Sequence, residues 1–366
     1  MNPTRKTAAL TTIAATALLL ATGCRCVTCD DDDGGGGGGF TPTENAWTDA
    51  GFRSTGRITG LTATADELFV FTPEEFTRLD QRDDTLTLTE KRTFLRSTRT
   101  LGYIASTPLA FARGIQNTIT NEQAVEFQLT QSSSGLVRVP IDSLTPELVA
   151  LESSGELIGA FNDDSRVYVQ PVILRSERIL GLMFFSLDYN LDFTAFESVE
   201  YVGMVSFPDA LEESDILSSI AYLDDHFYVA TKKGGYRVSE GGVVQTVVQT
   251  STWVRDFFEY DGNVYAALQA VTPLLESLDG VNFRSTFQQD MDLVDVLGDN
   301  IVTQRFQGWP YDVTDEVAER TRPLLLNEDF PTANDLYFGI VRSGQTYYLG
   351  IDRSLYKTDE LRAEEE

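Results

Sequence analysis

The stretch Trp253–Thr286 reads WVRDFFEYDGNVYAALQAVTPLLESLDGVNFRST and contains one complete copy of the pattern on which the chain is built. An alternating apolar run, Trp253–Tyr260, is followed by Asp261-Gly262-Asn263 and then by a second apolar run. Asp-Gly between two alternating apolar runs is a strong sequence signal for a tight β-hairpin. A third run at Leu274–Ser277 and a fourth that begins at Val281 complete a predicted four-stranded antiparallel meander.

The same pattern recurs along most of the chain. Each copy has an apolar strand, a polar turn, an apolar-aromatic strand and one or two further strands. The predicted first strands of the seven copies are Ile58–Thr64, Leu109–Arg113, Leu157–Phe161, Ile216–Leu223, Trp253–Tyr260, Leu293–Leu297 and Leu336–Arg342. Repeats of this kind and spacing are typical of propeller blades. We therefore expect an all-β, seven-bladed β-propeller over residues 46–360, with an acidic tail over 361–366. Six or eight blades, or a pair of β-sandwiches, remain as alternatives.

The two ends of the repeated region predict how the ring closes. The seventh copy ends at Thr358 after only three strands, and the segment Ala46–Phe52 precedes the first copy without belonging to it. We expect Ala46–Phe52 to supply the missing outer strand of the seventh blade. Such closure removes the open sheet edges that otherwise favour aggregation.

Composition excludes one class of partner. The 366 residues carry a formal net charge of -28, and no basic stripe offsets it. A field of this sign repels phosphate backbones, so we do not expect nucleic-acid binding. Attraction to anionic lipid head groups is disfavoured for the same reason.

The N-terminus has the features of an export signal. Arg5 and Lys6 precede a short apolar run that ends in small residues directly before Cys24. A basic region, a short apolar region and small residues before a cleavage site define a secretory signal. Because the small residues stop at a cysteine, residues 1–23 resemble a bacterial lipoprotein signal peptide. The resemblance implies that Cys24 is lipidated and anchors the chain to a membrane.

Residues 24–45 are predicted to be a disordered tether. Asp30–Asp33 repel one another, and Gly34–Gly39 have no side chains to bury. An acidic run soon after a lipidated cysteine resembles the surface-export signal of Bacteroidota lipoproteins, which implies an outer-membrane protein exposed at the cell surface. Cys26 and Cys29 lack the companion residues of a haem or zinc site, so a local disulfide or two tether thiols is expected.

One turn resembles a known propeller motif. Ser277-Leu278-Asp279-Gly280-Val281-Asn282-Phe283 is similar to a shortened Asp-box, the S-x-D-x-G-x-x-W turn of sialidase-like propellers. It lacks one spacer residue and has Phe283 where tryptophan is usual. The Asp-box is a structural turn, so the resemblance supports a fold and carries no activity.

Residues that could support catalysis are few. The single histidine, His226, lies in a predicted turn, and no cysteine occurs after Cys29. A Ser-His-Asp triad, a cysteine nucleophile and a multi-histidine metal site are therefore not expected, and we predict no catalytic residue, metal or cofactor. A sialidase-like site would need converging arginines, for which Arg113, Arg255 and Arg305 are the candidates. Hydrolysis by a pair of carboxylates stays open, because the many acidic residues make such a pair invisible in the sequence.

Two sets of charged residues are predicted to lie on opposite faces of the ring. The turns between first and second strands are acidic, which suits turn chemistry and would also give a cation- or basic-partner-binding face. They contain Asp66, Asp163, Asp164, Asp224, Asp225, Asp261 and Asp299. The links between second and third strands lie on the other face, where propellers often bind ligands. The candidate ligand-binding residues there are Arg175, Arg178, Lys232, Lys233, Trp309 and Arg353.

These features favour a surface-anchored lipoprotein that acts as a non-catalytic binding or scaffold module for a protein or glycan partner. The alternative is an extracellular carbohydrate-active enzyme, a hydrolase or lyase, with carboxylates at the mouth of the propeller channel.

Overall fold

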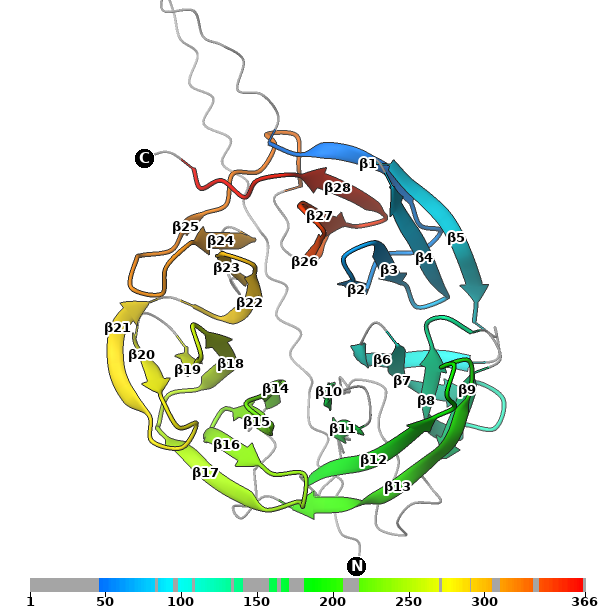
Figure 1. Ribbon diagram of the computed structural model, residues 1–366, viewed down its shortest axis with the longest axis horizontal. Helices are drawn as coiled ribbons and strands as arrows, with labels where there is room; N and C mark the ends of the chain where they lie inside the picture. The colour runs from blue at the N-terminus through cyan, green and yellow to red at the C-terminus, as the bar shows by residue number, and fades with distance from the viewer. Residues whose placement is uncertain are drawn as a thin grey trace, which may run out of the picture. The chain divides into compact units, whose positions relative to one another are not determined.

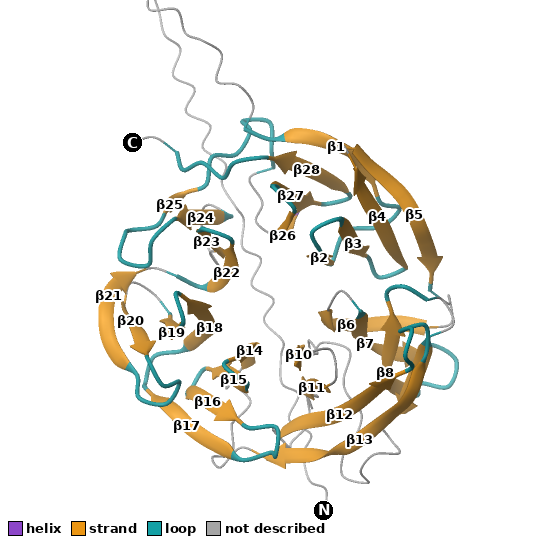
Figure 2. Ribbon diagram, viewed as in Figure 1, coloured by secondary structure: helices purple, strands orange, loops and turns teal. Residues whose placement is uncertain are grey.

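The computed structural model describes the following residues: 46–82, 85–94, 98–106, 109–132, 135–140, 158–162, 166–170, 181–206, 217–269, 272–289, 291–304, 310–331 and 336–364. Chain contacts divide the protein into two units, Met1–Thr43 and Glu44–Glu366, and all described residues lie in the second. The described residues form strands and connecting loops, without an α-helix (Figure 2).

Within the described residues, the strands pair into seven four-stranded antiparallel sheets, which we number along the chain (Figure 1). From the centre outward, sheet 1 contains β2 (Gly60–Ala63), β3 (Glu67–Phe71), β4 (Glu75–Arg82) and β5 (Thr85–Thr93). Sheet 2 contains β6 (Thr98–Ser106), β7 (Ala110–Asn117), β8 (Gln123–Leu129) and β9 (Leu136–Pro140). Sheet 3 contains β10 (Ile158–Asn162), β11 (Arg166–Gln170), β12 (Gly181–Tyr189) and β13 (Phe196–Ser206).

The remaining sheets repeat this order. Sheet 4 contains β14 (Leu217–Leu223), β15 (His226–Thr231), β16 (Gly234–Val238) and β17 (Val244–Gln249). Sheet 5 contains β18 (Val254–Tyr260), β19 (Asn263–Leu268), β20 (Thr272–Ser277) and β21 (Arg284–Gln289). Sheet 6 contains β22 (Leu293–Leu297), β23 (Asn300–Gln304), β24 (Tyr311–Thr314) and β25 (Arg322–Pro323). Sheet 7 contains β26 (Tyr337–Ser343), β27 (Thr346–Ile351), β28 (Ser354–Thr358) and β1 (Thr48–Arg53).

Burial along the strands explains their sequences. Second strands such as β15 and β27 are buried on both faces, because each sheet lies between two neighbours. They therefore read as continuous apolar runs, HFYVAT and TYYLGI, rather than as alternating ones. The outer strand β9 alternates between more and less exposed positions. Each strand thus carries the pattern that its distance from the centre requires.

The interfaces between sheets form the core. Seven hydrophobic clusters of the described residues each join two neighbouring sheets, and together they run around the whole ring. Between sheets 1 and 2, Phe76 stacks on Phe111 with ring centroids 5.3 Å apart. Between sheets 7 and 1, Tyr348 packs with Ile58 and Leu68. The all-β class and the propeller arrangement of four-stranded sheets are confirmed.

Ring closure follows the prediction from the sequence. β1 pairs antiparallel with β28, with Thr48 opposite Lys357 and Asp49 opposite Tyr356. Just before β1, the indole nitrogen of Trp47 donates a hydrogen bond to the carbonyl of Leu325 at 3.0 Å. Residues 47–53 therefore contact both β28 of sheet 7 and the segment that follows β25 of sheet 6.

The C-terminal end also pairs with sheet 6. Leu361 is buried, and the amide of Leu325 donates to the carbonyl of Arg362 at 2.7 Å. Leu324 and Ala363 form an isolated antiparallel bridge. The described part of the segment expected as an acidic tail, 361–364, thus packs against the propeller.

The predicted first strand of the second copy was wrong, whereas the other two strands predicted for it, Ala124–Leu129 and Leu136–Val139, coincide with β8 and β9. Leu109–Arg113, predicted as its first strand, overlaps β7, the second strand of sheet 2, and the first strand is β6. The ladder between β6 and β7 shifts register twice, between Thr100 and Gly102 and between Tyr103 and Ala105. These irregularities break the alternation by which a strand is recognised in a sequence.

Candidate functional site

Consecutive antiparallel strands place the links between first and second strands, and between third and fourth strands, at the same end of every sheet. We call this the hairpin face of the ring, and the opposite one the crossover face. Among the described residues, exposed aspartates occupy the first-to-second-strand turns of sheets 1, 4, 5 and 6. They are Asp66, Asp224, Asp225, Asp261 and Asp299.

Backbone geometry explains part of this pattern. Asp224, Asp225 and Asp261 have φ angles of 47°, 57° and 50°. Among residues other than glycine, aspartate and asparagine tolerate this left-handed conformation best, and tight hairpins between twisted strands require it. Turn geometry therefore selects Asp or Asn at these positions. Turn geometry does not require a negative charge, because the neutral side chain of asparagine also fits these positions.

The hairpin-face carboxylates differ in their partners. The Asp224 carboxylate lies 3.9 Å from the guanidinium of Arg237, which also lies 2.9 Å from His226 Nδ1. Asp225, Asp261 and Asp299 make no side-chain hydrogen bond or ion pair with the part of the chain that the structure describes. We call these three residues, together with Asp66, the acidic face.

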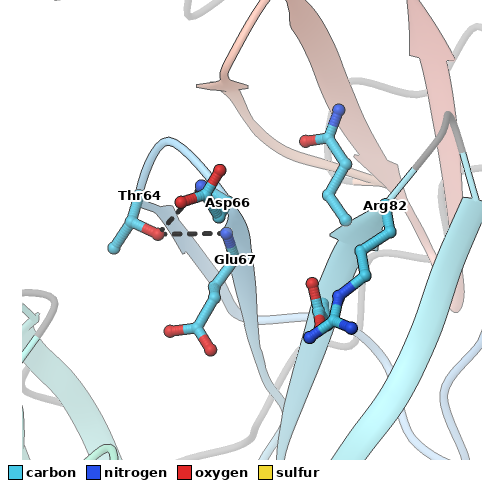
Figure 3. A pocket seen from close by; sticks show the side chains of 6 residues that line it. Thr64, Asp66, Glu67 and Arg82 are labelled. Carbon is cyan, nitrogen blue, oxygen red and sulfur yellow. Dashed lines mark hydrogen bonds and ion pairs between the residues drawn. The ribbon is translucent and has the colours of Figure 1, made fainter.

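A pocket of about 370 Å³ opens at the hairpin end of sheet 1 (Figure 3). It is lined by Thr64, Asp66, Glu67, Asp80, Gln81 and Arg82. The Thr64 hydroxyl accepts hydrogen bonds from the amides of Asp66 at 3.3 Å and Glu67 at 3.0 Å. The backbone amide of Gln81 donates a hydrogen bond to the backbone carbonyl of Asp66 at 2.9 Å, which connects the turn to β4. The loop that carries Asp66 is thus held in a fixed position.

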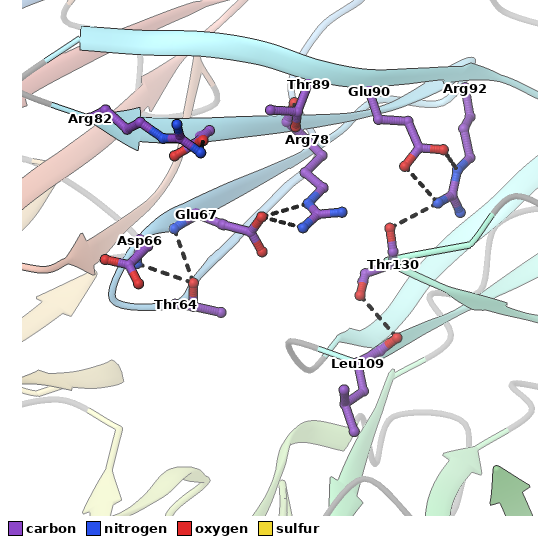
Figure 4. Close-up of polar contacts among 11 residues, drawn as sticks. Thr64, Asp66, Glu67, Arg78, Arg82, Thr89, Glu90, Arg92, Leu109 and Thr130 are labelled. Atoms are coloured by element: carbon purple, nitrogen blue, oxygen red, sulfur yellow. Dashed lines mark hydrogen bonds and ion pairs between the residues drawn. The ribbon is translucent and has the colours of Figure 1, made fainter. Parts of the chain in front are cut away.

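Ion pairs neutralise two of the three pocket carboxylates (Figure 4). Glu67 accepts a hydrogen bond from Arg78 Nε at 2.7 Å, and Asp80 lies 2.7 Å from a guanidinium nitrogen of Arg82. Asp66 accepts no side-chain contact among the described residues, and the Gln81 amide oxygen is buried without a hydrogen-bond partner there. The pocket therefore offers the free carboxylate of Asp66 to a group that only donates, such as an ammonium or a guanidinium.

Arg92 connects β5, the outer strand of sheet 1, to sheet 2 (Figure 4). Arg92 on β5 pairs with Glu90 at 2.6 Å and donates to the carbonyls of Leu129 at 2.5 Å and Thr130 at 2.8 Å. Its guanidinium also lies over the ring of Phe76, 5.0 Å from the centroid. A buried arginine with carbonyl partners on the next sheet fixes the relative position of sheets 1 and 2.

The crossover face contains the described part of the predicted ligand-binding set. Lys232 and Lys233 are exposed in the link between β15 and β16, and Arg353 is exposed between β27 and β28. They belong to sheets 4 and 7, which are not neighbours in the ring. The backbone carbonyl of Arg353 accepts the amide of Ser54 at 2.8 Å. The other members, Arg175, Arg178 and Trp309, lie outside the described residues, as do Asp163, Asp164 and Arg305.

The described arginines of the predicted sialidase-like set have separate structural environments. Arg113 on β7 is buried and pairs with the buried Glu126 directly opposite on β8, and it lies 3.4 Å from the centroid of Phe94. Arg255 on β18 pairs with Asp292 and lies 4.3 Å from the ring centroid of Trp253. Arg113 stabilises the interface between sheets 1 and 2, whereas Arg255 links sheets 5 and 6.

The Asp-box-like turn joins β20 and β21. Asp279 accepts hydrogen bonds from the amides of Asn282 at 2.8 Å and Val281 at 2.9 Å, and from the Ser277 hydroxyl at 2.9 Å. The two backbone amides hold the pKa of Asp279 far below its usual range. Phe283 packs edge-on against Phe257, with ring centroids 5.7 Å apart. Asp279 therefore has a structural role in this turn.

Asp256 is a buried carboxyl group that contacts three sheets, and we did not predict it from the sequence. Asp256 on β18 accepts hydrogen bonds from the Ser219 hydroxyl on β14, from the Val294 amide on β22 at 2.7 Å, and from the Phe257 amide at 2.9 Å. Burial raises the pKa of Asp256 to about 7, although these donors oppose the shift. Only its long-range contacts, which a single sequence does not reveal, distinguish Asp256 from the surface aspartates.

This shift predicts how stability depends on pH. Because the folded-state pKa is raised from 3.8 to about 7, the native protein retains a proton that the unfolded chain loses, and Asp256 favours folding less as pH rises from about 4 to 7. In urea denaturation across this range, Asp256→Asn should make the slope of unfolding free energy against pH more positive by about one proton. The exposed control Asp225→Asn should keep the wild-type slope. An Asp256→Asn slope identical to wild type would contradict the assignment.

Among the residues that the structure describes, no group of three or more His, Cys, Asp or Glu side chains is arranged to hold a metal ion. No helix in the same ranges has the length and apolar character needed to span a bilayer.

Comparison with known proteins identifies neighbours by structure only. No family model matches the chain, and no curated protein matches it. The structure is similar to that of PorZ, a surface component of the type IX secretion system of Porphyromonas gingivalis, with a TM-score of 0.50 and 10% identity. It is also similar to the extracellular domain of BT4673 from B. thetaiotaomicron, with a TM-score of 0.53 and 11% identity. The likeness is one of fold.

Coverage of these neighbours is unequal. The matches include 88% of this chain but 39% of the PorZ chain, and 86% of this chain but 40% of the BT4673 chain. The chain therefore spans about two fifths of the length of both proteins. Both neighbours are bacterial surface or extracellular proteins that contain a propeller-like region.

Proposed function

We propose that the chain is a surface lipoprotein, anchored through Cys24, whose propeller is a non-catalytic module that binds a protein partner through the acidic face. The observation that carries this proposal is the set Asp225, Asp261 and Asp299. These exposed carboxylates lie at equivalent turns of three consecutive sheets and have no side-chain partner among the described residues.

Charge and shape favour a basic protein surface as the ligand. The turns repeat around the ring, so a partner with several lysines or arginines can contact several of them at once. The pocket beside Asp66 adds a site for one such side chain, since it presents an exposed carboxylate without a side-chain partner among the described residues. The surface location of PorZ and of the BT4673 domain is consistent with an envelope role.

A cationic probe tests the acidic face directly. We expect fluorescent dodecalysine to bind the protein, and binding to weaken as salt rises from about 50 to about 300 mM because added ions screen exposed charges. The triple variant Asp225→Asn, Asp261→Asn, Asp299→Asn should weaken binding about tenfold by fluorescence anisotropy. Asparagine tolerates the left-handed turn of Asp225 and Asp261, so the fold should be retained.

The matched control removes the same charge from the crossover face. Glu74, Glu122 and Asp352 are exposed there, and the variant Glu74→Gln, Glu122→Gln, Asp352→Asn changes the net charge equally. This control should retain most of the binding. Equal losses in the two triple variants would show that only net charge attracts the probe, and the proposed face would be rejected. A glycan array with the same proteins tests whether a glycan is the ligand instead.

A carbohydrate-active enzyme is the second candidate, and Asp295 is the observation that favours it. Asp295 has an exposed side chain on β22, the innermost strand of sheet 6, and desolvation by the protein around it raises its pKa to about 6. A carboxyl group with a raised pKa suits general acid catalysis. Release of reducing sugar from a polysaccharide, lost in Asp295→Asn, would replace the binding-only proposal with this one.

A further inference from the structure

An apolar projection rises from the hairpin face in sheet 3. The link between β12 and β13 is a third-to-fourth-strand link, so it emerges on the same face as the acidic turns. Its side chains Leu191 and Phe193 are 101% and 45% exposed. We call these two residues, with Tyr189 and Phe196 at their base, the apolar tip.

The backbone of the tip is held in place by Asn190. Its side-chain oxygen accepts hydrogen bonds from the amides of Thr194 at 2.8 Å and Ala195 at 2.9 Å, and its amide nitrogen donates to the Thr194 hydroxyl at 2.9 Å. The Phe193 amide also donates to the carbonyl of Asn190 at 3.0 Å. Leu191 is thus presented by an ordered loop, which limits the entropy lost on binding.

The base of the tip continues the protein core. Tyr189 contacts Phe196 with ring centroids 5.4 Å apart, and both pack against the hydrophobic cluster between sheets 2 and 3. Phe193 lies over the outer side of Tyr189, with centroids 5.8 Å apart. The exposed ring of Phe193 therefore packs on aromatic residues that themselves pack on the core.

Phe193 adopts a backbone conformation that its side chain does not favour. Its φ angle is 53°, in the left-handed region where a bulky residue is a genuine outlier. Asparagine or glycine would fit this turn with less strain, and either would expose less apolar surface. Strain of this kind, kept for an exposed aromatic side chain, is typical of a binding site rather than of a turn selected for stability.

The surroundings of the tip indicate the kind of partner. Asp188, Asp192 and Glu197 are exposed beside it, and Asp192 lies between Leu191 and Phe193 in the sequence. Insertion into a bilayer would desolvate Asp192, and the charge of -28 would repel anionic lipids and a second copy of the chain. An apolar tip with an acidic rim fits an apolar pocket with a basic rim.

We propose that the apolar tip anchors the partner of the acidic face by inserting Leu191 and Phe193 into an apolar pocket, rimmed by lysine or arginine, on that protein. The inference rests on the proposed function, because the acidic face supplies the long-range attraction and the tip supplies the desolvated contact. A few aromatic or aliphatic side chains that fill a desolvated pocket can carry much of the binding energy at a protein interface.

The test begins with a photo-cross-linking amino acid at position 191 in the full-length protein, in cells that naturally produce it. The cross-linked protein is identified by mass spectrometry, purified, and titrated with wild-type protein and variants. Leu191→Ser should weaken binding about 30-fold. Phe193→Asn should weaken it about tenfold while leaving the midpoint of thermal unfolding unchanged or higher, since the strain is relieved. Ile119→Ser, at a residue 80% exposed on the crossover face, should bind as wild type.

The outcomes separate the tip from the acidic face. Cross-links from position 191 only to lipid, only to a second copy, or to no molecule would overturn the inference. So would a purified partner whose affinity is unchanged by Leu191→Ser. If affinity then still fell with salt and in the triple aspartate variant, the proposed function would stand without the tip. If Leu191→Ser weakened binding but salt and the triple variant did not, the acidic face would be rejected and the tip retained.

Discussion

Replacing Trp47 by alanine should lower the free energy of unfolding by about 3–5 kcal/mol, as expected for loss of a large buried aromatic side chain. Trp47 is 2% exposed and packs in the cluster between sheets 6 and 7. Its amide donates to Asn327 Oδ1 at 2.9 Å, and its carbonyl accepts the Asn327 side-chain amide at 2.7 Å. It therefore joins the N-terminal strand to sheet 6 while β1 pairs with sheet 7.

Urea denaturation followed by tryptophan-independent circular dichroism measures this effect. Ile119→Ala, at an exposed position, serves as the control and should change stability little. Deletion of residues 47–53 should have a larger effect, because β28 would become an open edge that favours aggregation. A Trp47→Ala variant as stable as the control would contradict the role of this segment in closing the ring.

Replacing Glu126 by glutamine should also cost about 3–5 kcal/mol, because it leaves the charge of a buried arginine uncompensated. Glu126 is 0% exposed and lies between Arg113 on β7 and Arg138 on β9, the latter at 2.7 Å. Burial lowers the pKa of Arg113, and the attraction of Glu126 opposes that shift. Arg138 is partly exposed and can turn to solvent, whereas Arg113 cannot.

A double variant distinguishes a structural role from a ligand-binding one. Arg113→Met with Glu126→Leu removes both buried charges and should recover most of the lost stability, since an apolar pair of similar size often replaces a buried ion pair without loss. If Glu126→Gln unfolded at the wild-type urea concentration, Arg113 would not depend on this partner. The sialidase-like reading of Arg113 would then regain support.

The sequence predicted the repeating unit because its signals are local. Asp261-Gly262 between alternating runs identifies a hairpin, and the incomplete seventh copy indicates where Ala46–Phe52 belongs. The register shifts between β6 and β7 interrupt the alternation of side chains, so the sequence of β6 lacked this signal. Pairs such as Glu126 with Arg113 depend on register across strands, which a single sequence specifies only once both strands are aligned.

The candidate site was predictable in the same uneven way. The aspartates of the acidic face all lie in turns between first and second strands, so their common face follows from the meander itself. The pocket beside Asp66 depends on Gln81 and Arg82 at the far end of β4, which only the fold brings to that turn. The apolar tip was missed because an exposed leucine in a link looks like any other loop residue until its exposure and the φ angle of Phe193 are known.

A two-face cross-linking scan in intact cells tests the central claim most directly, namely that the hairpin face of the propeller holds a protein partner. The photo-cross-linking amino acid would replace Leu191 or Asp261 on the hairpin face, and Lys232 or Arg353 on the crossover face. We predict that both hairpin-face positions cross-link to one and the same protein and that neither crossover-face position does. Cross-links that arise only from positions 232 and 353 would contradict this prediction and would place the binding surface on the opposite side of the ring.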